Sequence, residues 1–284
     1  MALVSRLSLR TLQALAFLLG LAALALAQEK HTLEHDGHTR TFELHVPRGY
    51  DGSRPVPLVI ALHPYPSDGA RLRAMAGFDE KADEHGFLVA YPDGLNGGFN
   101  ALICCGRADD VGFIRALIDR LGAKYAIDKR RIYATGISNG ADLSYRLAAE
   151  LPDVFAAIAP VSGGLGGEKV RQDPAGSVPK TPVSLIAFHG EWDQYLALFN
   201  RGLQIWREHV GCAPPETTPV DPGKTVTREH SRCRNGAEVV VYNLRDMSHA
   251  WPGGKPDGQL ADPRTPIKAT DLIWEFFASH PKLD

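Results

Sequence analysis

A serine between two glycines is the residue whose setting most directly indicates chemistry. The segment 136–140 (GISNG) follows the strand-like run 131–135, and its last two residues begin a helical stretch, 139–151. G-x-S-x-G between a strand and a helix forms a sharp turn that presents the serine hydroxyl outward, with glycines where side chains would collide with the strand and helix. The helix start also favours negative charge developing there. We therefore interpret Ser138 as a nucleophile rather than as a surface serine of a glycine-rich turn.

A serine hydroxyl needs a base to activate it, and the base needs an acid to orient it. With this turn, the acid and then the histidine follow the serine along the chain. Asp193 lies just after the apolar run 183–188, and His249 lies six residues past another apolar run, 237–243, so these two are the candidate acid and base. Glu191 is a weaker candidate acid because it lies closer to the strand end, and Asp221 and His230 are weaker because they lie inside the polar segment 211–236. His280 is a weaker base because it lies at the end of the last helix.

Acyl transfer also needs hydrogen-bond donors for the oxyanion that develops on the carbonyl oxygen. The backbone N–H of Asn139, directly after the serine, is one candidate. The loop after the first buried strand should supply the other, and there Tyr65 stands between two prolines that have no N–H. Aromatic residues beside these motifs, Tyr65, Trp192, Tyr195 and Trp251, either form an aromatic wall of a substrate pocket or pack inside the protein.

Strands and helices alternate along the chain, which predicts an α/β fold with a mostly parallel central sheet and helices on both faces. In such sheets ligands bind beyond the carboxyl ends of the strands. We expect one domain over 28–284, with long loops at 163–182 and 211–236 and with Asp109 and Asp110 as caps at a helix start. The predicted strands are 41–46 (an edge strand), 57–62, 87–91, 131–135, 155–161, 183–188 and 237–243, and the predicted helices are 71–85, 109–125, 139–151, 201–209 and 270–279.

The chain has 284 residues and a formal charge of −2, with 44% hydrophobic and 23% charged residues, which excludes a disordered chain or coiled coil and gives no basic excess for nucleic acid. Residues 1–27 combine two arginines, a 14-residue apolar run and a final Ala-Leu-Ala, the pattern of a cleaved signal peptide. We therefore expect a secreted or periplasmic protein with no membrane partner after cleavage. The oligomeric state is not readable from the sequence.

Export would allow the four cysteines to pair, in any of three ways. Cys104 and Cys105 are adjacent, so the pair is either buried and reduced or locally bridged, with a packing role. Metal binding is not expected, because no second C-x-x-C or H-x-x-x-H group accompanies them.

Several segments together resemble the secreted esterases related to polyhydroxybutyrate depolymerases, feruloyl esterases and acetylxylan esterases (carbohydrate esterase family 1 and its LpqC-like group). The resemblance implies an α/β-hydrolase fold, a serine esterase mechanism without a cofactor, and Ser138, Asp193 and His249 as nucleophile, acid and base. It also implies a Cys212–Cys233 disulfide. The segments that carry it are 62–63 (LH), 91–94 (YPDG), 104–106 (CCG), 109–114 (DDVGFI), 133–141 (YATGISNGA), 189–193 (HGEWD), 249–254 (HAWPGG) and 273–277 (IWEFF).

The chain departs from that pattern in two places beside the expected pocket. Pro64-Tyr65-Pro66 replaces the usual glycine-rich run, and the segment 194–198 lacks the usual Val-Pro-Tyr-like turn. The leading hypothesis is a secreted serine carboxylesterase that acts on feruloyl or acetyl esters of plant polysaccharide, or on short polyhydroxyalkanoate-type esters. The alternatives are a peptidase of the same fold and a non-catalytic ligand-binding protein on a hydrolase frame.

Overall fold

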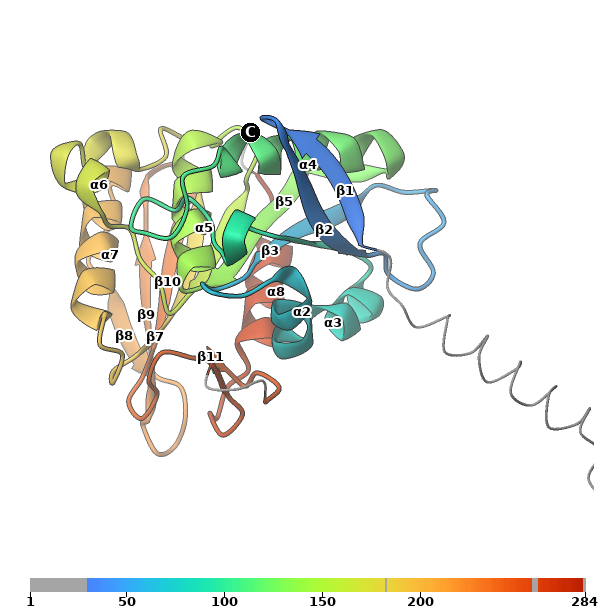
Figure 1. Cartoon of the computed structure of the whole chain (residues 1–284). Coiled ribbons are helices and arrows are strands. Elements are labelled where there is room, and N and C mark those ends of the chain that lie inside the picture. Colours follow the sequence, from blue (N-terminus) through green and yellow to red (C-terminus); the bar gives the residue numbers. More distant parts are fainter. Residues whose placement is uncertain (1–29, 182, 257–259, 283–284) are drawn as a thin grey trace, which may run out of the picture.

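The central feature of the fold is a ten-stranded sheet in the order β1-β2-β4-β3-β5-β6-β7-β10-β9-β8 (Figure 1). The computed structural model describes residues 30–181, 183–256 and 260–282. The six middle strands run parallel, and two antiparallel strands flank them at each edge. The strands are β1 His31–His35, β2 His38–His45, β3 Val56–Leu62, β4 Leu88–Pro92, β5 Ile127–Ile137, β6 Ala157–Val161, β7 Ser184–Gly190, β8 Glu216–Pro219, β9 Val226–Arg232 and β10 Glu238–Leu244, with a separate small pair, β11 Trp251–Pro252 and β12 Ala261–Asp262.

Helices cover both faces of this sheet, which confirms the predicted fold class (Figure 1). Strand β3 shows why the sequence folds this way: Leu58 and Leu62 pack into the core of one face, while Val59 packs into the core of the other. A strand buried on both faces reads as a continuous apolar run. The helices α4, α5 and α7 contribute to the first core and α2, α3 and α8 to the second. Their bounds are α2 Gly69–Ala76, α3 Phe78–His85, α4 Asp110–Lys124, α5 Asn139–Glu150, α6 Glu168–Gln172, α7 Leu196–Val210 and α8 Ala269–Ser279.

Three sequence-based expectations about the elements were wrong. The helix expected over 71–85 is two helices, because Gly77 adopts a left-handed conformation (φ 69°) and ends α2. The strand expected at the edge, β2, is covered by β1, for which no strand was predicted. The segment 211–236 is not a long loop but forms β8 and β9, which extend the sheet.

A disulfide between Cys212 and Cys233 joins the end of α7 to the end of β9. The two cysteines also face one another across an isolated antiparallel bridge. The pairing implied by the family resemblance is therefore present. The structure also bridges the adjacent Cys104 and Cys105, so this pair is locally bridged rather than reduced.

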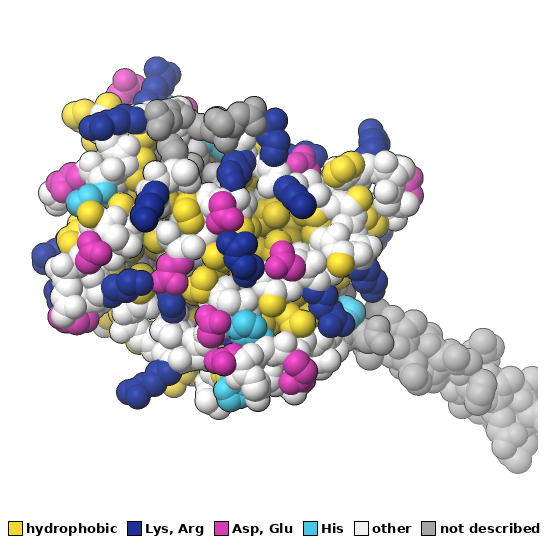
Figure 2. All heavy atoms as spheres, turned by 90° about the horizontal axis from the view of Figure 1, so that it is seen from above, with side chains coloured by type: hydrophobic (Ala, Val, Ile, Leu, Met, Phe, Trp, Pro, Cys, Tyr) yellow, Lys and Arg dark blue, Asp and Glu magenta, His cyan; other side chains and the backbone are white. Residues whose placement is uncertain are grey.

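Charged side chains of both signs alternate over the surface in Figure 2, as expected from the near balance of 31 basic and 33 acidic residues. Within the described part of the chain, no helix is both long enough and apolar enough to cross a membrane. The expected signal peptide, 1–27, lies outside the described residues.

Candidate active site

Ser138 lies between the end of β5 and the first residue of α5, with φ 56° and ψ −122°. A non-glycine residue in this region costs about 1–3 kcal/mol and is held there by its surroundings. The Ser138 N–H donates to the Val161 carbonyl at 3.0 Å. The flanking glycines allow the turn because a Cβ on Gly136 would lie 2.6 Å from the Leu62 oxygen, and one on Gly140 would overlap the same carbonyl. The predicted strand–turn–helix setting of Ser138 is thus present.

His249 and Asp193 form a hydrogen-bonded pair, with 2.6 Å between His249 Nδ1 and Asp193 Oδ2. The Asp193 side chain is fully buried and the His249 ring is 21% exposed. Oδ1 of Asp193 accepts the Tyr195 N–H at 2.9 Å, so both carboxylate oxygens are engaged. Because Nδ1 faces the carboxylate, Nε2 is the nitrogen left to exchange protons with a substrate or nucleophile.

Ser162 links the histidine loop to the serine turn, a role that the sequence did not reveal. Its hydroxyl donates to the Ala250 carbonyl (3.1 Å) and accepts the Ala250 N–H (3.2 Å), next to His249. Ser162 directly follows Val161, whose carbonyl holds the Ser138 N–H. Val161 and Ser162, consecutive residues at the end of β6, therefore hold the serine turn and the histidine loop together at the carboxyl ends of the strands. The only sequence signal was a serine immediately after a buried strand.

Three of the four rival acids and bases have other partners, and the fourth is exposed. Asp221 accepts the Thr225 hydroxyl and the Val226 N–H within a turn. His230 lies in β9 and pairs with Glu238 at 3.1 Å, and the His280 ring contacts the Phe276 carbonyl at 2.7 Å. Glu191 is exposed and lines a surface cavity.

One of the two residues proposed as oxyanion donors begins a helix, and the other lies on a loop that a buried histidine holds in place. Asn139 is the first residue of α5. In the loop that carries Tyr65, the His63 ring is fully buried; its Nε2 accepts the Gly94 N–H (2.9 Å), and Nδ1 donates to the Pro64 carbonyl (2.7 Å). Burial lowers the pKa of His63, so this histidine stays neutral and holds the loop against the end of β4.

Of the three aromatic residues assigned to the substrate pocket, two are exposed and the third is buried. Trp192 is 68% exposed and Tyr195 is 50% exposed, with the Tyr195 ring centroid 5.7 Å from that of His249. Trp251 is fully buried: its indole N–H donates to the Thr270 hydroxyl and its ring packs edge-on against Phe78. The assignment of Trp251 to a pocket wall was therefore wrong, because the side chain points into the core.

The expectation for the two aspartates at the start of α4 needs a similar correction. Asp109 is a cap that accepts the Gly112 N–H. Asp110 is instead fully buried; Oδ1 accepts a hydrogen bond from Arg40 at 2.6 Å and Oδ2 accepts the Asn100 N–H at 2.7 Å. A buried charge of this kind needs a partner, and Arg40 supplies it.

Asp142, in the first turn of α5, is the most strongly perturbed carboxyl near the site. Burial raises its pKa from the ordinary value of 3.8 to about 8, and one hydrogen bond from the Gly164 N–H (2.9 Å) opposes the rise. The folded protein therefore holds a proton between about pH 4 and pH 8 that the unfolded chain has lost. Stability must fall as the pH rises through this window.

We expect Asp142→Asn to remove much of this pH dependence, because an amide oxygen still accepts the Gly164 N–H but carries no charge. Urea denaturation at pH 5 and pH 9 should show a large loss of stability for the parent protein, up to about 4 kcal/mol, and a smaller one for the variant. The matched control is Asp153→Asn on the surface, which should keep the parent pH dependence. Equal losses in the parent and Asp142→Asn would contradict the prediction.

Taken together, the parallel sheet, the strained serine turn and the histidine–aspartate pair define an enzyme of the α/β-hydrolase fold. Solved structures agree on the fold: the acetyl xylan esterase from Aspergillus awamori superposes with a TM-score of 0.66 at 16% identity, over 88% of this chain and 99% of that one.

Residues 40–178 match the family model described as Esterase PHB depolymerase. Among curated relatives, feruloyl esterase B of Piromyces equi is 29% identical over 74% of this chain, and poly(3-hydroxyalkanoate) depolymerase C of Paucimonas lemoignei is 34% identical over 80%. The chain spans 42% and 62% of the length of these two relatives, and 83% of feruloyl esterase C of Emericella nidulans, at 28% identity. Residues 40–178 thus match the Esterase PHB depolymerase domain, and the chain is a carboxylic ester hydrolase.

Proposed function

We propose that this esterase is a secreted serine carboxylesterase that forms an acyl-enzyme on Ser138, with His249 as base and Asp193 as the acid that orients it. The observation that carries the proposal is the 2.6 Å contact between His249 Nδ1 and the buried Asp193, at the sheet edge where Ser138 adopts a positive φ. Glycine at 136 and 140 and the tether through Ser162 support it.

In the proposed reaction, His249 Nε2 takes the proton of the Ser138 hydroxyl as the oxygen attacks the ester carbonyl. The N–H groups of Asn139 and Tyr65 hold the oxyanion, and Asp193 stabilises the imidazolium. The imidazolium then gives its proton to the leaving alkoxide, which departs as an alcohol. Water, deprotonated by His249, attacks the acyl-Ser138 ester and releases the acid with regeneration of the serine hydroxyl.

The proposed substrates follow from the relatives, which are named feruloyl esterases and a poly(3-hydroxyalkanoate) depolymerase. We infer that the chain hydrolyses feruloyl or acetyl esters of plant polysaccharide, or short polyhydroxyalkanoate-type esters. We further propose that 1–27 is a cleaved signal peptide and 28–284 one catalytic domain. The two disulfides support an oxidising compartment.

A fluorophosphonate probe tests the mechanism directly, because it reacts with an activated serine and not with an ordinary one. We expect one label per chain, mapped to the peptide that contains Ser138, and ester hydrolysis that stops as the label forms. Unlabelled protein that still binds ester would favour the non-catalytic alternative, and cleavage of peptides without ester hydrolysis would favour the peptidase. A panel of methyl ferulate, acetylated xylan and hydroxybutyrate oligomers then ranks the substrates.

A further inference from the structure

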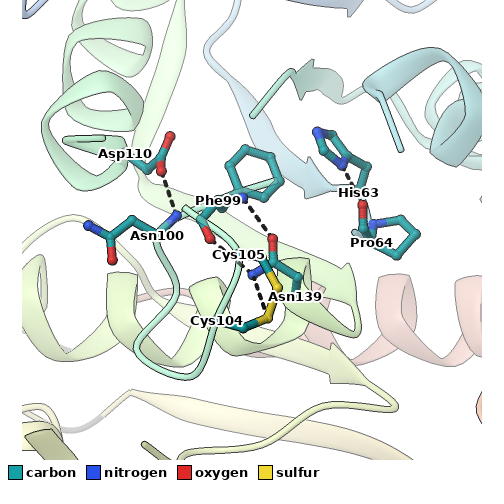
Figure 3. Close-up of a disulfide and its surroundings, with 8 residues drawn as sticks. All are labelled: His63, Pro64, Phe99, Asn100, Cys104, Cys105, Asp110 and Asn139. Carbon is teal, nitrogen blue, oxygen red and sulfur yellow. Dashed lines mark hydrogen bonds between the residues drawn. A yellow bond between two sulfur atoms is a disulfide. The ribbon is translucent and has the colours of Figure 1, made fainter. Parts of the chain in front are cut away.

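The disulfide between Cys104 and Cys105 lies beside the residue that follows the nucleophile (Figure 3). The side-chain amide of Asn139 contacts Cys104 Sγ at 4.0 Å. The same side chain accepts the Phe99 N–H (2.7 Å) and donates to the Phe99 carbonyl (3.0 Å). The start of the disulfide loop, 99–106, is therefore fastened to the start of α5.

The loop is a firm surface rather than a loose one. The Asn100 N–H donates to the buried carboxylate of Asp110 at 2.7 Å, and Arg146 donates to the Asn100 carbonyl at 2.6 Å. Cys105 itself has φ 86°, a conformation that the loop must hold in place. Cys104 is nonetheless exposed, so the disulfide is available for contact with a ligand.

Tyr65 lies against the same surface. A Cβ placed on Gly98 would come within 2.5 Å of Tyr65 Cδ2 and 3.3 Å of Cys105 Cβ, so the ring and the cysteine both pack around this glycine. The Tyr65 side chain is 49% exposed. Tyr65, Cys104 and Cys105 thus form one partly exposed surface of a ring and two sulfurs, the disulfide–tyrosine surface.

The strand order places this surface on one side of Ser138 and the histidine on the other. Tyr65 and the disulfide loop follow β3 and β4, whereas Asp193 and His249 follow β7 and β10, and Ser138 follows β5 between them. The leaving oxygen of an ester must receive its proton from the histidine. The alcohol part therefore belongs on the β7 and β10 side, and the acyl part is left to the β3 and β4 side.

We propose that the disulfide–tyrosine surface binds the acyl group of the ester and selects a planar aromatic or unsaturated acyl group over acetyl. The inference rests on the proposed Ser138 mechanism. Sulfur is polarizable and makes favourable contacts with aromatic rings, and the Tyr65 ring adds an offset or edge contact. An acetyl group is too short to gain either contact.

Two esters with the same alcohol and different acyl groups, p-nitrophenyl ferulate and p-nitrophenyl acetate, measure this selectivity. For Cys104→Ser/Cys105→Ser we expect the ratio of kcat/KM (ferulate over acetate) to fall about fivefold, because the contact with the aromatic acyl group is lost. Cys212→Ser/Cys233→Ser, which removes the remote disulfide, is the matched control and should keep the parent ratio.

A ratio that stays at the parent value would overturn the inference. If kcat/KM fell equally for both esters, the loop would only position Asn139, and if neither changed, the surface would not contact the acyl group. Should the double variant fail to fold, a phosphine can open the 104–105 bond in the Cys212→Ser/Cys233→Ser protein; one phosphine and one water give two thiols and a phosphine oxide. The ratio should then fall and recover on reoxidation. Acetate hydrolysis that survives Ser138→Ala would instead count against the proposed function.

Discussion

We expect Ser138→Ala to lower kcat for an aryl acetate by about 10⁴- to 10⁶-fold, with the protein still folded. Without the hydroxyl, the ester carbonyl has no nucleophile, and neither the His249–Asp193 pair nor the backbone donors can replace it. The Ser138 backbone at φ 56° and ψ −122° adds a second readout. Alanine keeps the conformational cost, whereas glycine adopts these angles freely, so Ser138→Gly should be as inactive as Ser138→Ala but more stable by about 1–3 kcal/mol.

Hydrolysis rates and urea denaturation of the two variants check both parts of this prediction. Ser144→Ala is the matched control. Ser144 lies in α5, the helix that follows Ser138, is fully buried and donates to the Gly140 carbonyl. Its loss should cost some stability and leave the rate near that of the parent. A Ser138→Ala protein that keeps a tenth of the parent rate would rule out Ser138 as the nucleophile.

The middle of the sheet was predictable because its strands are continuous apolar runs. The run 57–62 packs into both cores, as its composition indicates. The edge strands gave no such signal: β8 (Glu216–Pro219) is exposed at all four residues, and it is a strand only because it pairs with β9. A strand whose order comes from backbone pairing alone leaves little hydrophobic pattern in the sequence.

At the site, chain order and strand ends were enough to select the pair His249 and Asp193, which the structure joins by a hydrogen bond. Side-chain direction was not predictable in this way. Trp192 and Trp251 each lie within two residues of one member of the pair, yet the first is exposed and the second is buried against Thr270. The role of Ser162 was not predicted from its position after a buried strand, because its partner, Ala250, lies 88 residues away.

The second large effect is expected from Asp193→Asn, which keeps the size of the side chain but changes which nitrogen of His249 carries the proton. In the parent, Oδ1 accepts the Tyr195 N–H and Oδ2 faces His249 Nδ1. An asparagine that keeps its oxygen toward Tyr195 must turn its NH₂ group toward Nδ1. Nδ1 then has to accept, so the ring proton moves to Nε2, and Nε2 can no longer take the proton of Ser138.

We therefore expect kcat to fall about 10⁴-fold at pH 7 with little change in KM, since the altered group does not contact the ester. Steady-state kinetics with p-nitrophenyl acetate measure this, and circular dichroism checks the fold. Glu191→Gln is the matched control, because Glu191 is a neighbouring carboxylate in the same loop that is exposed rather than paired with His249. If Glu191→Gln were the inactive variant and Asp193→Asn the active one, the acid would have been assigned to the wrong residue, although the nucleophile and the base could still stand.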